Sequence, residues 1–81
     1  MDSALVELIE VLAQLEQDSS IPKNVKLKLQ SAIFVLKEEG KDLKIKANKA
    51  LQQLDEVSDD PNMPSYFKPQ IWNVVSMLEN I

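Results

Sequence analysis

The sequence contains no cysteine and no histidine, and these two absences exclude a large part of enzyme chemistry. Without cysteine there are no disulfides, no thiolate metal ligands and no thiol nucleophile. Without histidine the commonest general base and transition-metal ligand is missing. We therefore expect a protein that is not an enzyme and that holds no metal and no cofactor.

Glycine is also scarce, since the 81 residues include only one. Leucine, alanine, glutamate, lysine and glutamine are abundant, and these residues favour helix. A chain of this length buries only about 60–65% of the surface that it exposes when unfolded, so it can form a core but not a deep pocket. We predict a single helical domain over residues 1–81.

Long apolar runs are missing as well. No stretch approaches the roughly 18–20 residues of a membrane span. The chain begins Met1-Asp2 and continues with scattered acids, without the small-residue cleavage site of a signal peptide. These features predict a cytoplasmic protein with no membrane partner.

Two acidic turns, each ending in an apolar residue and a proline, lie 42 positions apart. They are Asp18-Ser19-Ser20-Ile21-Pro22 and Asp60-Pro61-Asn62-Met63-Pro64. Proline suits the first turn of a helix and pushes the preceding residue out of helical geometry. We therefore expect the chain to reverse at both turns, with helices beginning at Pro22 and Pro64 and with Ile21 and Met63 tucked beneath the turns.

Apolar residues recur every three or four positions, which is the spacing of one helix face. The spacing predicts helices at about 3–17, 22–39, 43–57 and, after an irregular turn, 69–80. The residues predicted to face the core are Leu5, Leu8, Ile9, Leu12, Leu15, Val25, Leu29, Ala32, Ile33, Leu36, Ala47, Ala50, Leu51, Leu54, Val57, Phe67, Ile71, Val74, Val75 and Leu78.

Three residues set the expected helix ends. Gly40 is placed to end the second helix in a left-handed conformation, and Asp42 is a good cap for the third. Pro69 would lose a hydrogen bond and crowd an upstream carbonyl inside a helix. An irregular turn is therefore expected from Pro64 to Lys68.

The two halves of the chain repeat each other's pattern. When residue n is placed on residue n+42, the apolar positions of both helices and the hinge between them keep one register. The halves are therefore predicted to be similar helical hairpins, at about 3–39 and 43–80. Because each hairpin must cover the apolar face of the other, we predict an all-α, four-helix up-and-down bundle.

Several stretches of the chain resemble an archaeal group, uncharacterised protein family 0147. The stretches are Ile21-Pro22-Lys23-Asn24-Val25, Glu39-Gly40-Lys41-Asp42, Leu54-Asp55-Glu56-Val57-Ser58-Asp59-Asp60-Pro61-Asn62-Met63-Pro64 and Gln70-Ile71-Trp72-Asn73. The resemblance covers nearly the whole chain and implies a small, cytoplasmic helical bundle from an archaeon. It implies no activity. The chain departs from the group in Pro69 and in carrying lysine where relatives often carry arginine.

Lysines concentrate in the middle of a chain whose net charge is −4. Eight of the nine lie between Pro22 and Lys49, so a patch that contacts nucleic acid is one interpretation. The candidate contacts are Lys23, Lys26, Lys37, Lys41, Lys44 and Lys49, and the predicted patch also includes Lys28 and Lys46. The alternative, favoured by the acidic pI and the lack of arginine, is a set of solvated faces that pair with the acidic helices.

Some apolar residues exceed what a four-helix seam needs. They are Leu27, Phe34, Val35, Trp72 and Met77. The default expectation is that they widen the core. The alternative is an exposed patch that docks a partner or a second copy of the chain, with Leu27, Phe34, Trp72 and Met77 as candidate contacts and Trp72 the strongest.

The acids Asp55, Glu56, Asp59 and Asp60 are dense enough to suggest a hard-cation site, but their spacing does not match a calcium loop and helix ends explain them. Two function hypotheses remain. The first is a protein-interaction or self-association module without catalysis. The second is an RNA- or ribosome-associated accessory protein that uses the lysine-rich middle.

Overall fold

The computed structural model of the chain describes residues 3–81, which form four helices and no strand. The helices are α1 (Ser3–Glu16), α2 (Lys23–Lys37), α3 (Leu43–Ser58) and α4 (Phe67–Glu79). Met1 and Asp2, which were considered above in the argument against a signal peptide, lie outside the described residues.

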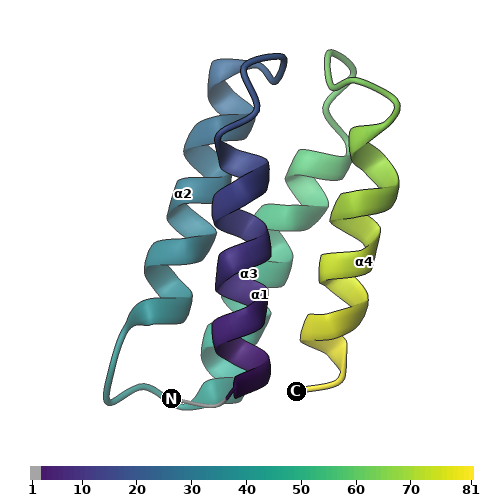
Figure 1. Cartoon of the computed structure of the whole chain (residues 1–81). Coiled ribbons are helices and arrows are strands. Elements are labelled where there is room, and N and C mark those ends of the chain that lie inside the picture. Colours follow the sequence, from purple (N-terminus) through teal and green to yellow (C-terminus); the bar gives the residue numbers. More distant parts are fainter. Residues whose placement is uncertain (1–2) are drawn as a thin grey trace.

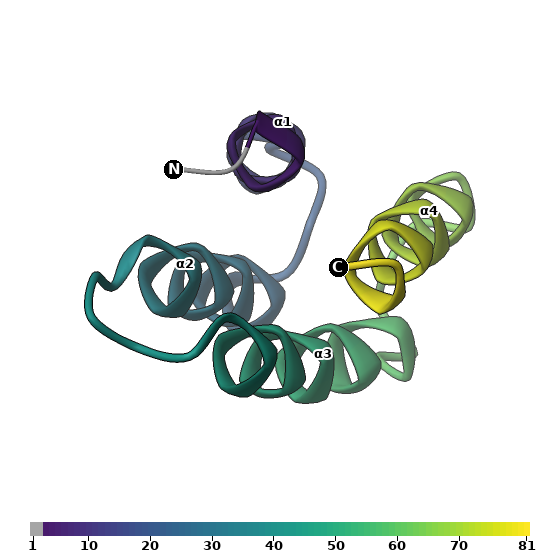
Figure 2. The ribbon, with the colours of Figure 1, turned by 90° about the horizontal axis from the view of Figure 1, so that it is seen from below.

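Each helix runs antiparallel to the next, and the four helices stand at the corners of a square (Figures 1 and 2). α1 and α3 each contact α2 and α4, whereas the diagonal pairs do not touch within residues 3–81. The bundle measures 35 × 20 × 19 Å. The prediction of an all-α, up-and-down bundle of two similar hairpins is confirmed.

The predicted apolar stripes meet in the interior of the bundle. All the residues expected to face the core are buried except Ile33, Leu51 and Val75, which are half-buried and pack against it. Ile21 and Met63 are also buried, as the hinge interpretation expected. Burying each of the larger side chains contributes about 1.5–3 kcal/mol, so these stripes are the main source of stability.

The starts of α2 and α4 differ from the prediction. Pro22 is the N-cap of α2 and not its first helical residue. α4 begins at Phe67, two residues earlier than expected, and Pro69 is its third residue. A proline there costs little, because the first N–H groups of a helix have no partner within the helix. The irregular segment is therefore confined to Pro64–Tyr66.

α2 ends at Lys37, and not near Glu39 as predicted. Glu38 already has extended geometry, with φ −62° and ψ 131°. Gly40 adopts the expected left-handed conformation, with φ 77°, but within the loop that follows. Asp42 caps α3 as predicted, because its Oδ1 accepts a hydrogen bond of 2.8 Å from the backbone N–H of Lys44.

The end of α2 is held by a lysine from the next helix. Lys46 Nζ donates hydrogen bonds to the carbonyl oxygens of Leu36, at 3.3 Å, and Glu38, at 2.8 Å. Lys46 is 9% exposed. The interpretation of Lys46 as part of a solvent-facing lysine patch is therefore wrong, because its ammonium group satisfies carbonyls that the end of a helix leaves without partners.

The two hinges are joined by a reciprocal pair of hydrogen bonds. Asp18 accepts a hydrogen bond of 2.9 Å from the Tyr66 hydroxyl, and Asp60 accepts one of 2.6 Å from the Asn24 amide. Asp60 and Tyr66 are the n+42 counterparts of Asp18 and Asn24. Each hinge aspartate therefore binds the residue six places beyond the other hinge aspartate, as a pseudo-twofold relation between the hairpins requires.

The hinge aspartates predict a loss of stability at low pH. A backbone hydrogen bond from Ser20, followed by that from Tyr66, lowers the pKa of Asp18 below its usual 3.8. Backbone and side-chain hydrogen bonds from Asn62 and Asn24 likewise lower the pKa of Asp60. A lowered folded-state pKa stabilises the fold above the unfolded value, and this contribution disappears as pH falls through the folded-state pKa.

We therefore expect the double variant Asp18→Asn/Asp60→Asn to be less stable than the natural chain at neutral pH. The difference should shrink below pH 3.8, where the natural aspartates become protonated. Urea unfolding followed by circular dichroism across this range measures it. Glu7→Gln, at an exposed α1 acid, is the control for removal of a charge. If the difference in unfolding free energy between the natural chain and the double variant stayed constant or grew on acidification, the hinge aspartates would not be the source of the stabilisation.

Candidate interaction surface

A groove runs between α1 and α2 on the outside of the first hairpin. One hollow, of about 320 Å³, is lined by Val6, Ile9, Glu10 and Lys37. A second, of about 330 Å³, is lined by Ala13, Glu16, Gln17, Gln30, Ile33, Phe34 and Lys37. Because the two hollows share Lys37, they form one surface, which we call the α1–α2 groove.

Phe34 borders the α1–α2 groove and is 70% exposed. The buried face of α2 is made by Val25, Leu29, Ala32 and Leu36. At 100° per residue, Phe34 points almost directly away from that face. Leu27, which is 54% exposed, lies two turns earlier on the same line. α2 therefore presents an apolar ridge beside the groove.

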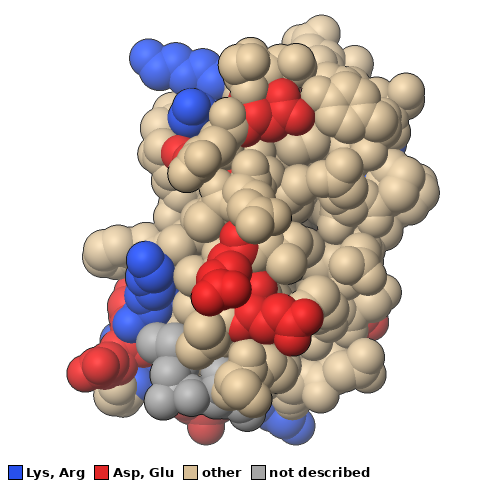
Figure 3. Space-filling view, viewed as in Figure 1, with Lys and Arg blue, Asp and Glu red and all other residues tan. Residues whose placement is uncertain are grey.

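The two helices that form the α1–α2 groove carry opposite charges. The charged residues of α1 are all acids, namely Glu7, Glu10 and Glu16. Those of α2 are all lysines, namely Lys23, Lys26, Lys28 and Lys37. Figure 3 shows this segregation, with acidic side chains over α1 and lysines along the edge formed by α2.

These opposite charges do not pair across the groove. Within residues 3–81 the one ion pair joins Lys28 of α2 to Glu56 of α3, at 3.7 Å. The direct polar link across the groove is a hydrogen bond of 2.6 Å that the Gln30 amide donates to Glu16. Glu10 and Lys37, which line the same hollow, form no ion pair with any other residue that the structure describes.

The structure separates the four candidate protein contacts. Leu27, Phe34 and Trp72 are exposed, the last by 57%, whereas Met77 is half-buried against the core. The default expectation that these residues widen the core is therefore wrong for the first three. In a square bundle each helix buries a stripe facing two neighbours, and these residues lie beyond it. Because α2 and α4 are diagonal, Phe34 and Trp72 belong to separate surfaces.

The candidate nucleic-acid contacts fall into two groups. Lys23 and Lys26 are in the first turn of α2, beside the hinges. Lys37, Lys41 and Lys44 lie near the opposite end of the bundle, with Lys49 further along α3. The 15 residues of α2 span roughly 22 Å at 1.5 Å per residue, and this length separates the groups.

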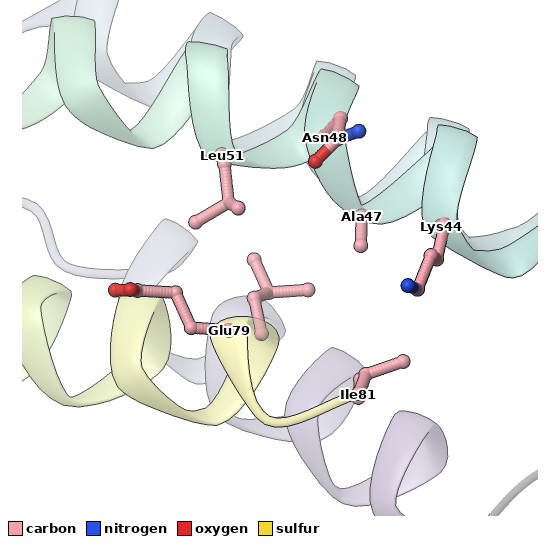
Figure 4. Close-up of a pocket in the computed structure, with 7 residues that line it drawn as sticks. Lys44, Ala47, Asn48, Leu51, Glu79 and Ile81 are labelled. Atoms are coloured by element: carbon pink, nitrogen blue, oxygen red, sulfur yellow. The ribbon is translucent and has the colours of Figure 1, made fainter.

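A third hollow, of about 370 Å³, lies between α3 and the end of α4 (Figure 4). Its lining residues are Lys44, Ala47, Asn48, Leu51, Leu78, Glu79 and Ile81. The charged ends of Lys44 and Glu79 lie at opposite sides of an otherwise largely apolar opening. Among residues 3–81 no three acids gather in a manner that would hold a metal ion.

The acids of the second hinge, which suggested a cation site, have separate roles. Glu56 pairs with Lys28, and Asp60 binds Asn24 and Asn62. Within the described part of the chain, no helix is both long enough and apolar enough to cross the membrane.

The family model described as "Uncharacterised protein family (UPF0147)" matches residues 1–81. The chain belongs to the UPF0147 family. The resemblance noted from the sequence motifs is thereby confirmed, including the archaeal character of the relatives.

Relatives match the UPF0147 chain along almost its whole length. The UPF0147 protein TK2131 of Thermococcus kodakarensis is 35% identical over 82 residues, covering 100% of this chain and 99% of the relative. The UPF0147 protein of Metallosphaera sedula is 38% identical over 80 residues, covering 99% and 90%. The crystal structure of MMP1188, a protein of unknown function, superposes with a TM-score of 0.91 at 35% identity, covering 96% and 89%.

Sequence reasoning missed part of the surface of the UPF0147 chain. Val6, Glu10 and Ala13 of α1, with Gln17 directly after it, line the groove but were not singled out. Their spacing of three or four residues marks a second face of α1, beside the buried stripe. This spacing can be read from the sequence. That the second face of α1 lies beside α2 is known only from the packing of the two helices.

Proposed function

We propose that this chain is a non-catalytic protein-interaction module whose α1–α2 groove accepts an amphipathic helical surface. The observation that carries the proposal is the 70% exposure of Phe34 at the edge of a groove with an apolar floor. Burying a phenylalanine side chain stabilises a complex by about 1.5–3 kcal/mol relative to leaving it in water. Aromatic side chains beside hollows are also typical anchors of protein interfaces.

The charges specify the occupant. A helical surface lying along the groove meets Glu10 and Glu16 from α1 on one side and Lys37 from the lysine-bearing α2 on the other. Its complement is an apolar stripe with lysines along the edge facing α1 and acids along the edge facing α2. Among the described residues 3–81 neither Glu10 nor Lys37 has an ion-pair partner, which leaves both charges to be paired by such a partner.

The chemistry of the groove supports binding without catalysis. Its polar side chains are carboxylates, amides and one lysine, and the sequence supplies no histidine or cysteine to act as base or nucleophile. An RNA-associated role stays a prediction, and the division of its six candidate lysines between two regions of the bundle does not favour it.

A designed peptide tests the proposal. The peptide is a fluorescent amphipathic helix with leucines along one face, lysines along one edge and glutamates along the other. We expect its fluorescence anisotropy to rise on titration with the protein at low salt. Phe34→Ser should weaken binding at least tenfold, the effect of losing a hot-spot residue.

Trp72→Ser is the matched control, because it removes another exposed aromatic side chain from the diagonal helix. Peptide binding to this variant should be unchanged. If the peptide failed to bind at millimolar protein and the chain showed no association of any kind through Phe34, the proposed function would be overturned. If Phe34→Ser and Trp72→Ser weakened peptide binding equally, the peptide would not bind specifically at the α1–α2 groove.

A further inference from the structure

We infer that the occupant of the α1–α2 groove is a second copy of this chain, held by a twofold axis parallel to the helices. The inference rests on the proposed function and names the partner of the same surface. It starts from the segregation of charge, since the first hairpin has one purely acidic helix and one purely basic helix.

Charge selects the direction of the twofold axis. When two copies meet face to face, the axis that relates them lies in the plane of contact. An axis running across the helices sets α1 on α1 and α2 on α2, which opposes acids to acids and lysines to lysines. An axis parallel to the helices sets α1 of each copy on α2 of the other, so that opposite charges meet along both halves of the interface.

The heights of the side chains along the bundle agree with this axis. Rotation about an axis parallel to the helices keeps every residue at its own height. Glu10 and Lys37 line one hollow and are therefore at similar heights, so Glu10 of each copy faces Lys37 of the other. These two charges have no ion-pair partner within the described part of their own chain.

The shape of the surface is also self-complementary. Phe34 borders a hollow of about 330 Å³ whose α1 wall includes the small side chain of Ala13. The same rotation places Phe34 of one copy over Ala13 of the other. Each copy thus supplies one aromatic ridge and one hollow to receive the ridge of its partner, as an isologous interface requires.

The area of this face is sufficient for a dimer. The bundle is 35 Å long and about 20 Å wide, so one side presents roughly 700 Å² in projection. Stable interfaces bury about 800 Å² per partner, and side-chain relief raises the buried area above the projected value. A contact along most of the α1–α2 face therefore reaches the size of a specific, modest interface.

Sedimentation equilibrium of the full chain tests the inference. We expect the natural chain to reach twice its 9.2 kDa mass as concentration rises from micromolar to millimolar. Phe34→Ser should raise the dimer dissociation constant at least tenfold, whereas Trp72→Ser should leave it unchanged. Both substituted positions are exposed, so circular dichroism should show a folded bundle in each variant.

A pair of charge reversals tests the axis. Glu10→Lys and Lys37→Glu should each weaken the dimer at low salt, because each homodimer then opposes like charges. Mixing the two variants should restore association, since both cross-copy pairs become complementary again. Single variants that dimerise as well as the natural chain would overturn the parallel axis.

The two proposals fail in different ways. A natural chain that stays monomeric at millimolar concentration would overturn the inference, and the interaction module would stand if the designed peptide still bound through Phe34. A dimer that is lost with Trp72→Ser and kept with Phe34→Ser would overturn both, because the contact would then lie on α4.

Discussion

Replacing Phe67 with alanine is expected to destabilise the bundle by about 3–5 kcal/mol. Phe67 is 0% exposed and is among the largest fully buried side chains. It stands in the first turn of α4, where its loss leaves a cavity beneath the second hinge. A domain of 81 residues has an unfolding free energy of about 4–12 kcal/mol, so this single change removes a large part of the total.

The other phenylalanine of the chain is the matched control. Phe34→Ala makes the same chemical change at a position that is 70% exposed, and we expect it to alter stability by less than about 0.5 kcal/mol. Urea denaturation of dilute protein, followed by circular dichroism, measures both variants without a contribution from association. Similar losses in the two variants would contradict the assignment of Phe67 to the core and Phe34 to the surface.

The features that sequence reasoning predicted correctly depend on local rules. The spacing of apolar residues placed the four stripes, and the prolines at positions 22 and 64 placed the two reversals. Asp42 was identified as a cap because an aspartate directly before a helical stripe can bind the N–H groups of that helix. Each of these inferences needs only residues within about one or two helix turns of one another.

The error at the end of α2, and the link between the hinges that was not predicted, both involve contacts between separate elements. Nothing near Glu38 in the sequence predicts that α2 stops before it, because the carbonyls released there bind Lys46, eight residues beyond Glu38. The link from Tyr66 to Asp18 likewise joins residues 48 positions apart. The n+42 repeat relates this link to the one between Asn24 and Asp60, but the repeat alone does not show that the hinges touch.

The sequence identified residues of the candidate surface but not where these residues lie in the bundle. Phe34 and Trp72 stood out because their helices carry more apolar residues than a narrow seam buries. Whether such residues are buried depends on how the helices are arranged around the core. In this bundle α2 and α4 occupy opposite corners, which separates the two aromatic residues and leaves Phe34 with the groove beside α1.

The second large effect is expected from Lys46→Met, which should destabilise the bundle by about 1.5–3 kcal/mol. Methionine keeps an apolar stem of similar length but cannot donate, so the carbonyls of Leu36 and Glu38 lose a charged hydrogen-bond donor. Leu36 is fully buried, and water therefore has poor access to replace the bond. The loss arises from unsatisfied carbonyls at the end of α2 and not from a cavity.

Lys49→Met is the control, because Lys49 is exposed on the same helix and the substitution removes the same charge. It should change stability by less than about 0.5 kcal/mol. Urea unfolding compares the two variants, and amide hydrogen exchange locates the effect, since the last turn of α2 should lose protection in Lys46→Met only. Equal destabilisation in both variants would assign the effect to charge alone. Unchanged protection at the end of α2 would show that the ammonium group does not hold that end, and the loop from Glu38 to Asp42 would then need another anchor.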